Sequence, residues 1–298
     1  MSSIIIDGRK IAADLLIQVQ SIVSLLKEQY AVTPKLSVIL IGNQEASNIY
    51  VRTKIREASK VGIEIDVIPF DSVCDKSEVI SVIERLNLDN SNHGTIIQSP
   101  LPCGLSFKEI AQNVIPTKDV DGFHVINAGS LDCEIGEYFV PCTALGCVGL
   151  LLSVYSSIKG KHVVVVGRSN IVGRPLSSLL LNLDATVTVC HRATTNLASI
   201  MRAGEIVVSA TGVSQQFTKE YFAKGATIID VGITRTANRL VGDVNFDNLL
   251  GHASYITPVP GGVGPMTVAS LMMNVVRSAS ISAGCSLYRR LYDAFQLH

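Results

Sequence analysis

Residues 161–175 read KHVVVVGRSNIVGRP, and this stretch decides the fold class. Four consecutive valines indicate a strand that is buried on both faces, as in parallel sheets. A turn with Gly167, Ser169 and Gly173 follows, and Pro175 suits the first turn of a helix. Glycines at such a turn let the backbone approach a pyrophosphate at the helix N-terminus. The spacing is not the G-x-G-x-x-G fingerprint, so an ordinary strand-to-helix turn stays equally open.

Similar apolar runs recur along the chain and alternate with helical patterns. Strands are predicted at 35–42, 63–70, 94–100, 161–167, 185–190, 205–212, 226–232 and 255–260. Helices are predicted at 47–61, 76–86 and 265–276, with Ser47 as an N-cap candidate, and a terminal helix is predicted in the tail 285–298. The alternation predicts an α/β protein with right-handed crossovers.

A chain of 298 residues suits two domains of ordinary size. The strand–turn–helix rhythm breaks near 125–145, so the boundary is expected there. We predict an N-terminal α/β catalytic domain at 1–140, on which 268–298 return to pack. We predict a Rossmann-like nucleotide-binding domain at 141–267.

The charge and cysteine content argue against several classes of partner. Lys plus Arg number 25 and Asp plus Glu number 25, so nothing favours nucleic acid or an anionic membrane. No apolar run is long enough for a membrane span or a signal peptide. Seven cysteines without a C-x-x-C pair indicate neither a disulfide framework nor a metal site. They are read as small buried hydrophobes in a reducing, cytoplasmic compartment.

The end of the next strand favours NADP over NAD. The run ATVTVC at 185–190 is followed by His191 and Arg192, with no carboxylate in reach of a ribose 2′-hydroxyl. Arg192, together with Arg168 in the turn, would pair with a 2′-phosphate. A solvated surface arginine is the plain alternative for Arg192.

Candidate chemical residues lie in the first half. Tyr50 and Lys54 are four apart, so they share a helix face. The Tyr50 ring can stack on a planar heterocycle, and Lys54 can act as a base if burial lowers its pKa. Gln98 ends a predicted strand, where side chains point into the ligand crevice of α/β sheets. Asp121, in KDVDG, can accept bonds from a guanidine-like edge. From spacing alone, a surface pair and turn or capping bonds remain open for these residues.

The segment PVPGGVGP at 258–265 frames three glycines with prolines. Such a loop is rigid and lets the backbone line a flat ligand, although a plain connection has the same composition.

Taken together, these residues resemble the bifunctional methylenetetrahydrofolate dehydrogenase/cyclohydrolase family, the FolD type. The match extends over about 270 residues in one consistent order. It rests on the motifs IIIDGRKIA, SNIYVRTK, IIQSPLP, PTKDVDG, PCTALG, VVVVGRSNIVGRP, TVTVCHR, IIDVGI and ITPVPGGVGPMTVA.

The resemblance implies an NADP-dependent oxidation of 5,10-methylenetetrahydrofolate followed by hydrolysis to 10-formyltetrahydrofolate. The implied catalytic residues are Lys54, Tyr50, Gln98 and Asp121. The implied folate-binding residues are Tyr50, Gln98, Asp121, Pro260, Gly261, Gly262 and Val263. The implied NADP-binding residues are Gly167, Arg168, Ser169, Arg192 and Ile233. Folate would bind in a cleft between the two domains, without a metal, in a cytoplasmic homodimer built through the nucleotide domains.

Three positions depart from the family pattern. Ser99 stands where Leu is common, Ala144 where Pro is common, and Arg56 where Lys is frequent. Three rivals remain open: a dehydrogenase without hydrolase activity, another two-domain NADP dehydrogenase such as one acting on shikimate, and a silent NADP-binding scaffold. Retention of Lys54 and Asp121 argues against the scaffold.

Overall fold

The structure is a computed structural model, and it describes residues 2–102, 104–236 and 239–296. Cys103 and the last two residues of the tail therefore lie outside the described residues. The chain divides into two compact units. Unit 1 consists of Met1–Ala13 and Thr143–Thr267, and unit 2 of Asp14–Cys142 and Val268–His298. The prediction of a two-domain α/β protein is confirmed.

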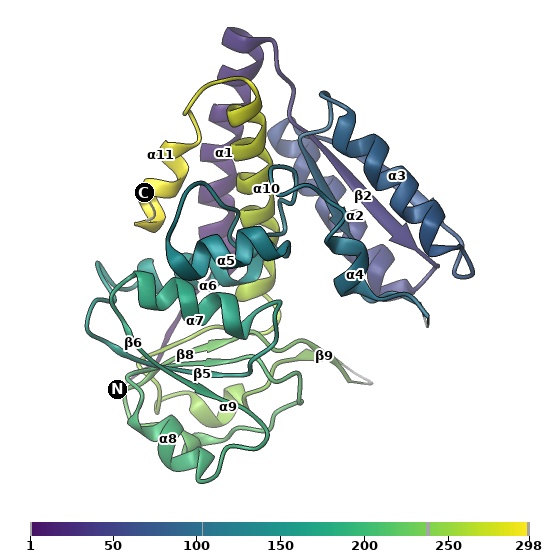
Figure 1. Ribbon diagram of the computed structural model, residues 1–298. Coiled ribbons are helices and arrows are strands. Elements are labelled where there is room, and N and C mark those ends of the chain that lie inside the picture. The colour runs from purple at the N-terminus through teal and green to yellow at the C-terminus, as the bar shows by residue number, and fades with distance from the viewer. Residues whose placement is uncertain (1, 103, 237–238, 297–298) are drawn as a thin grey trace. The chain divides into compact units, whose positions relative to one another are not determined.

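Unit 1 is built on a six-stranded parallel sheet (Figure 1). Its strand order is β1-β11-β8-β7-β5-β6, and every pairing is parallel. The strands are β1 (Ile4–Ile5), β5 (His162–Val166), β6 (Thr186–Cys190), β7 (Ile206–Ser209), β8 (Thr227–Asp230) and β11 (Tyr255–Ile256). The order reverses between β5 and β7, and this switch point is where α/β sheets bind ligands.

Helices cover both faces of this sheet, which explains its continuous apolar strands. In Figure 1, α6 and α7 lie on one side of the sheet and α8 and α9 on the other. The further elements of unit 1 are α6 (Cys142–Leu152), α7 (Gly173–Asn182), α8 (Leu197–Ala203), η1 (Lys219–Tyr221), β9 (Thr234–Arg235), β10 (Leu240–Val241) and α9 (Phe246–Leu249). Strands β7 and β8 are buried at every residue, whereas β6, at the edge, is partly exposed.

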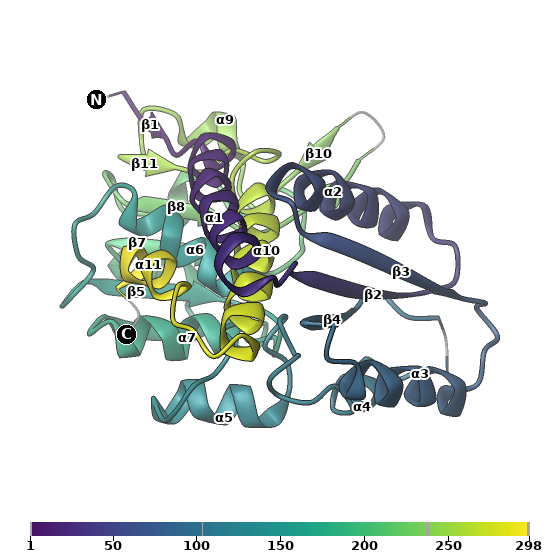
Figure 2. The same cartoon turned by 90° about the horizontal axis from the view of Figure 1, so that it is seen from above.

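Unit 2 contains a three-stranded parallel sheet in the order β3-β2-β4. Its strands are β2 (Lys35–Ile41), β3 (Glu64–Phe70) and β4 (Gly94–Ile97). Its helices include α2 (Glu45–Val61), α3 (Lys76–Leu88), α4 (Phe107–Ala111), α5 (Val125–Cys133), α11 (Arg289–Tyr292) and η2 (Asp293–Phe295). Figure 2 shows α2 on one side of this sheet and α3 and α4 on the other.

Two long helices each contain residues of both units. They are α1 (Gly8–Tyr30) and α10 (Val263–Ser282). No helix was predicted at α1. Residues 1–140 were predicted to form one domain, whereas β1 pairs with β11 in the sheet of unit 1. Residues 268–298 group with unit 2.

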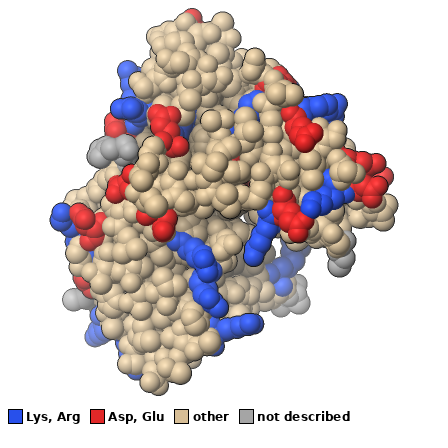
Figure 3. All heavy atoms as spheres, in the orientation of Figure 1, with Lys and Arg blue, Asp and Glu red and all other residues tan. Residues whose placement is uncertain are grey.

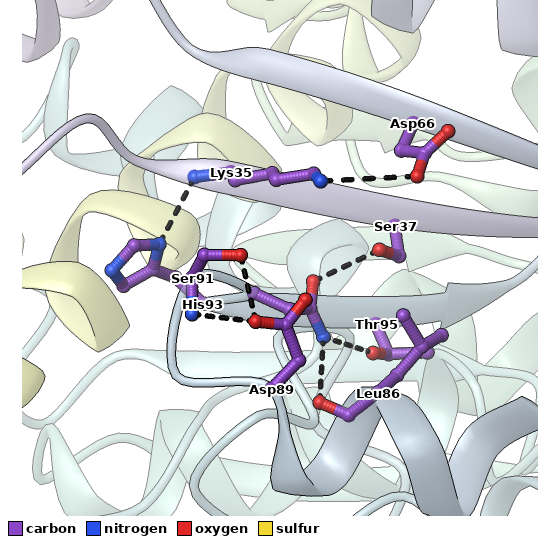
Figure 4. A network of polar contacts seen from close by, with 9 residues as sticks. Lys35, Ser37, Asp66, Leu86, Asp89, Ser91, His93 and Thr95 are labelled. Atoms are coloured by element: carbon purple, nitrogen blue, oxygen red, sulfur yellow. Dashed lines mark hydrogen bonds and ion pairs between the residues drawn. The ribbon is translucent and has the colours of Figure 1, made fainter.

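A buried polar network joins β2, β4 and the end of α3 (Figure 4). Asn92 accepts a hydrogen bond from Ser37 Oγ at 3.0 Å. Its amide nitrogen donates to Thr95 Oγ1 at 2.9 Å and to Leu86 O at 3.2 Å. Asn92, Ser37 and Thr95 are almost fully buried, so each polar group needs its partner.

One local prediction was wrong. Helix α2 begins at Glu45, with Gln44 as N-cap and no side-chain capping bond, so Ser47 lies inside the helix. The Ser47 hydroxyl is buried and has no partner among the described residues. The predicted strands are confirmed with shorter bounds, because the terminal residues continue as loops.

The surface carries charged side chains of both signs. On the face drawn in Figure 3, basic and acidic side chains are both scattered rather than separated by sign. Among the described residues, no helix combines the length and the apolar character that a membrane span requires.

Candidate active site

Lys54 and Gln98 meet in unit 2. Lys54 lies on α2, and its Nζ donates a hydrogen bond to Gln98 Oε1 at 3.0 Å. Gln98 directly follows β4, and its backbone N–H continues the ladder by bonding Ile39 O at 2.9 Å. Its amide nitrogen also donates to Ser99 O at 2.8 Å, so the orientation of the amide is fixed. The carboxyl end of β4 therefore presents a fixed acceptor to Lys54.

Burial dominates the electrostatics of Lys54. Desolvation of the ammonium lowers its pKa, and the negative charge of Asp121 opposes this shift. As a whole residue, Lys54 is intermediate in exposure. A lysine whose pKa is lowered in this way can serve as a general base.

The two carboxylates of KDVDG have different surroundings. Asp119 is buried and accepts hydrogen bonds from His124 N at 2.7 Å and from Asn127 Nδ2 at 2.9 Å, so its role is to hold the loop. Asp121 Oδ1 faces the Cys142 thiol at 3.6 Å, a long contact. Burial raises the pKa of Asp121, and the charge of Lys54 lowers it. Asp121 is therefore the carboxyl with acceptor capacity left for a ligand.

Tyr50 precedes Lys54 by one turn of α2. Its side chain is 42% exposed, and partial burial raises the pKa of its phenol. The ring is thus neutral and accessible, as stacking on a flat ligand requires.

The turn after β5 has the geometry that a dinucleotide needs. Gly167 has φ +130°, and a Cβ added there would lie 2.4 Å from Ala210 O, which follows β7. A Cβ on Gly173 would lie 2.0 Å from Gly167 O. Only glycine fits at both positions, and the two loops of the switch point come into close backbone contact. Val172, the N-cap of α7, gives the helix no side-chain bond, which leaves its N-terminus available to an anion.

Two arginines at this edge carry positive charge without a partner. Arg168 and Arg192 are exposed, and neither has an ion-pair partner among the described residues. The Ser169 hydroxyl accepts a bond from Val172 N at 3.2 Å and so shapes the turn. These residues fit an anionic dinucleotide with a 2′-phosphate.

The loop before α10 also belongs to unit 1. The Val259–Pro260 peptide bond is cis, and Gly261 has φ +113°. A Cβ on Gly262 would meet Thr257 Cβ and Pro258 O at 2.7 Å, so the backbone is tightly packed. Ile233, just beyond β8, is 43% exposed.

The predicted residues are divided between the two units. Tyr50, Lys54, Gln98 and Asp121 belong to unit 2, and the glycine turn, Arg192, Ile233 and the 260–263 loop belong to unit 1. Sequence reasoning missed the contact of Cys142 with Asp121, because Cys142 was read as a small hydrophobe. Its place in the PCTALG motif was the available signal. Among the described residues, no cluster of His, Cys, Asp or Glu could hold a metal.

These features define a class of protein, a two-domain α/β protein with a dinucleotide-type parallel sheet and a desolvated lysine bonded to the residue that follows β4. Two family models match the chain. Tetrahydrofolate dehydrogenase/cyclohydrolase, catalytic domain, covers residues 6–121, and the NAD(P)-binding domain of the same name covers residues 141–283. The chain belongs to the tetrahydrofolate dehydrogenase/cyclohydrolase family.

Individual relatives agree with this assignment. The bifunctional protein FolD of Rickettsia massiliae is 45% identical over 279 residues, covering 92% of this chain and 96% of that protein. The crystal structure of the bifunctional FolD from Campylobacter jejuni has a TM-score of 0.91 at 38% identity, covering 93% of this chain and 99% of that one. FolD of Trypanosoma brucei, solved with NADP cofactor and inhibitor, also gives 0.91 at 38% identity, covering 95% and 99%.

Proposed function

We propose that this protein oxidises 5,10-methylenetetrahydrofolate to 5,10-methenyltetrahydrofolate with NADP and then hydrolyses the product to 10-formyltetrahydrofolate. Family membership supports both reactions. The observation that carries the hydrolytic step is the 3.0 Å hydrogen bond from Lys54 Nζ to Gln98 Oε1 at a site where burial lowers the lysine pKa.

Lys54 is the proposed base of the hydrolysis. Because Gln98 accepts one N–H of a neutral amine, the lone pair of Lys54 stays free to take a proton from water. The water oxygen then bonds to the methenyl carbon. The bond from this carbon to N5 breaks, its electron pair stays on N5, N5 takes the proton held by the Lys54 ammonium, and the hydroxyl loses its proton to solvent and becomes the formyl oxygen on N10. An ammonium would be repelled by the cationic substrate, so the lowered pKa suits this role.

The other residues of unit 2 would orient the folate. Tyr50 offers an accessible ring for stacking on the pterin or its aryl extension, and Asp121 offers a carboxylate to the guanidine-like edge of the pterin. Pro260, Gly261, Gly262 and Val263 of unit 1 are proposed to line the folate as well. We propose accordingly that unit 2 carries the folate chemistry and unit 1 the cofactor.

The residues that would hold NADP are those of the switch point. Gly167, Arg168 and Ser169 would hold its pyrophosphate, Arg192 its 2′-phosphate, and Ile233 would contact it beyond β8. The cofactor supplies a hydride acceptor for the methylene carbon.

An assay of the purified protein tests this function. With 5,10-methylenetetrahydrofolate and NADP we expect reduced cofactor to form and methenyltetrahydrofolate to disappear faster than in buffer. Persistent methenyltetrahydrofolate would leave a dehydrogenase alone. No turnover with NADP or NAD would favour the silent-scaffold alternative.

We further propose a cytoplasmic homodimer that supplies formyl groups for purine biosynthesis. Strand β6 supports the dimer because it lies at the sheet edge and exposes part of its surface, where a second copy could pair. Sedimentation velocity would give the mass of two chains for a dimer and of one chain if the proposal is wrong.

A further inference from the structure

The C-terminal tail is linked to Asp121 by a short path of hydrogen bonds. The tail starts beyond Ala283, where the match of the NAD(P)-binding family model ends, and α11 within it carries Tyr292. The Tyr292 hydroxyl donates a hydrogen bond to Asn274 Oδ1 on α10. Both side chains are buried, and both belong to unit 2.

The side-chain amide of Asn274 in turn bonds to the backbone beside Asp121. Its amide nitrogen donates to Val120 O at 2.7 Å and to Val140 O at 3.0 Å. Val120 O belongs to the peptide unit that joins Val120 to Asp121. Val140 stands two residues before Cys142, whose thiol faces Asp121. One amide therefore ties together the two segments that set the position of Asp121.

The two segments are packed too closely to shift independently. Gly122 has φ +72°, and a Cβ there would lie 2.6 Å from Phe139 O and 2.8 Å from Pro141 N. The Asn274 amide also lies 3.6 Å from Cys142 Sγ. A change in the orientation of this amide would alter its bonds to both segments, and so would shift the position of Asp121.

Arg277 fixes the ring that carries the hydroxyl. It follows Asn274 by three residues on α10, and its guanidinium lies 4.7 Å from the Tyr292 ring centre and 5.2 Å from that of Tyr288. Phe139 adds a third ring at 5.4 Å. Cations over aromatic faces attract the rings, so Arg277 holds the tail against α10.

We propose that Tyr292 is a positioning residue for the folate site: its hydroxyl fixes the Asn274 amide, which sets Asp121 relative to Lys54. The role of Asp121 in this proposal rests on the proposed function. Without the hydroxyl, the buried Asn274 Oδ1 loses the donor that it has among the described residues, and the amide tilts to find another. The Val120 carbonyl is then held less firmly, and Asp121 acts less strongly on Lys54.

A pair of variants of the full-length protein tests the proposal. Tyr292→Phe removes the hydroxyl that bonds Asn274. Tyr288→Phe is the matched control, because Tyr288 is equally buried but its hydroxyl bonds Glu137 Oε1 at 2.9 Å. Both variants keep the rings around Arg277. The hydrogen bond lost in Tyr292→Phe is buried and the one lost in Tyr288→Phe is part-buried, so the fall in Tm should be the larger in Tyr292→Phe.

The expected results separate positioning from general stability. In Tyr292→Phe, kcat/KM for methenyltetrahydrofolate hydrolysis should fall about tenfold, since small misplacements in a site are costly. The acidic limb of its pH profile of kcat/KM should move to lower pH, because a displaced Asp121 would raise the pKa of Lys54 less than it does in the wild type. The KM for NADP and all constants of Tyr288→Phe should stay within about twofold of wild type.

Equal kinetics and equal pH profiles in the two variants would overturn the proposal and leave the tail a purely stabilising role. Hydrogen exchange gives a readout that does not depend on folate chemistry. Amides at 117–123 should exchange faster in Tyr292→Phe than in Tyr288→Phe. A wild-type protein without folate activity would reject the proposed function. Equal hydrogen exchange in the two variants would reject the link through Asn274, whatever the folate activity.

Discussion

At the scale of single residues, burial rather than a neighbouring charge sets the chemistry of Lys54. Desolvation is the largest influence on its pKa and lowers it, while Asp121 works in the opposite direction. The same burial raises the pKa of Asp121. For each group, burial favours the neutral form and the attraction between Lys54 and Asp121 favours the charged form. Burial is the larger influence on Lys54, and a neutral amine is what general-base chemistry needs.

Asp121→Asn tests this balance. The Asp121 charge favours the ammonium form of Lys54, so its removal lowers the lysine pKa further. A base with a lower pKa is deprotonated at lower pH, and the acidic limb of kcat/KM for the hydrolysis should therefore move to lower pH. The KM for folate should also rise, about tenfold, for loss of a charged hydrogen-bond acceptor. A limb that moves to higher pH would contradict the assigned electrostatics.

Arg192→Ala tests the choice of cofactor. Arg192 is exposed and lacks an ion-pair partner among the described residues, so a 2′-phosphate would be its main contact. We expect the KM for NADP to rise about 10- to 100-fold, because that is the change in affinity expected when one charged hydrogen bond is lost. The KM for NAD should change little. Arg202→Ala on α8 is the control and should change neither constant. An equal loss with both cofactors would mean that Arg192 does not read the 2′-phosphate.

At the scale of elements, strand ends place the functional groups. The ends of β5 and β6 could be predicted because apolar runs stop there, and Gly167 and Arg192 follow these ends. Strand β4 was predicted to continue to residue 100, but it ends at Ile97, directly before Gln98. The start of α2 could not be predicted from the sequence, because its N-cap, Gln44, makes no side-chain capping bond. Asn274 was also missed, because a single amide in the apolar pattern of α10 gives no sign of the loops that it contacts.

The network around Asn92 gives a prediction for element stability. Asn92→Ala would leave Ser37 Oγ and Thr95 Oγ1 buried without their partner. We expect the free energy of unfolding to fall by about 3 kcal/mol, the typical cost of buried polar groups left unpaired. Ser91→Ala, an exposed neighbour, should cost less than about 0.5 kcal/mol. Equal urea midpoints for the two variants would show that the network does not stabilise the sheet.

At the scale of the whole molecule, local patterns predict the sheets but not every long-range pairing. Parallel α/β architecture follows from continuous apolar strands that alternate with helices, and the two-unit structure confirms it. The pairing of β1 with β11 was not predicted. Strand β1 has only two residues, which is too short to show a periodic pattern, and its partner strand β11 lies about 250 residues further along the chain. The tail was predicted as a helix, but its contacts with α10 depend on tertiary packing.

One measurement tests the central claim, that Lys54 is the base of a folate cyclohydrolase. Lys54→Gln and wild type are given methenyltetrahydrofolate directly, and its hydrolysis is followed by absorbance. Lys60→Gln serves as the control, because Lys60 lies on the same helix, has a side chain that is 60% exposed and pairs with Glu57. We predict that Lys54→Gln loses about 10²- to 10⁴-fold of the hydrolysis rate while Lys60→Gln matches wild type. Hydrolysis by Lys54→Gln at the wild-type rate would contradict the account.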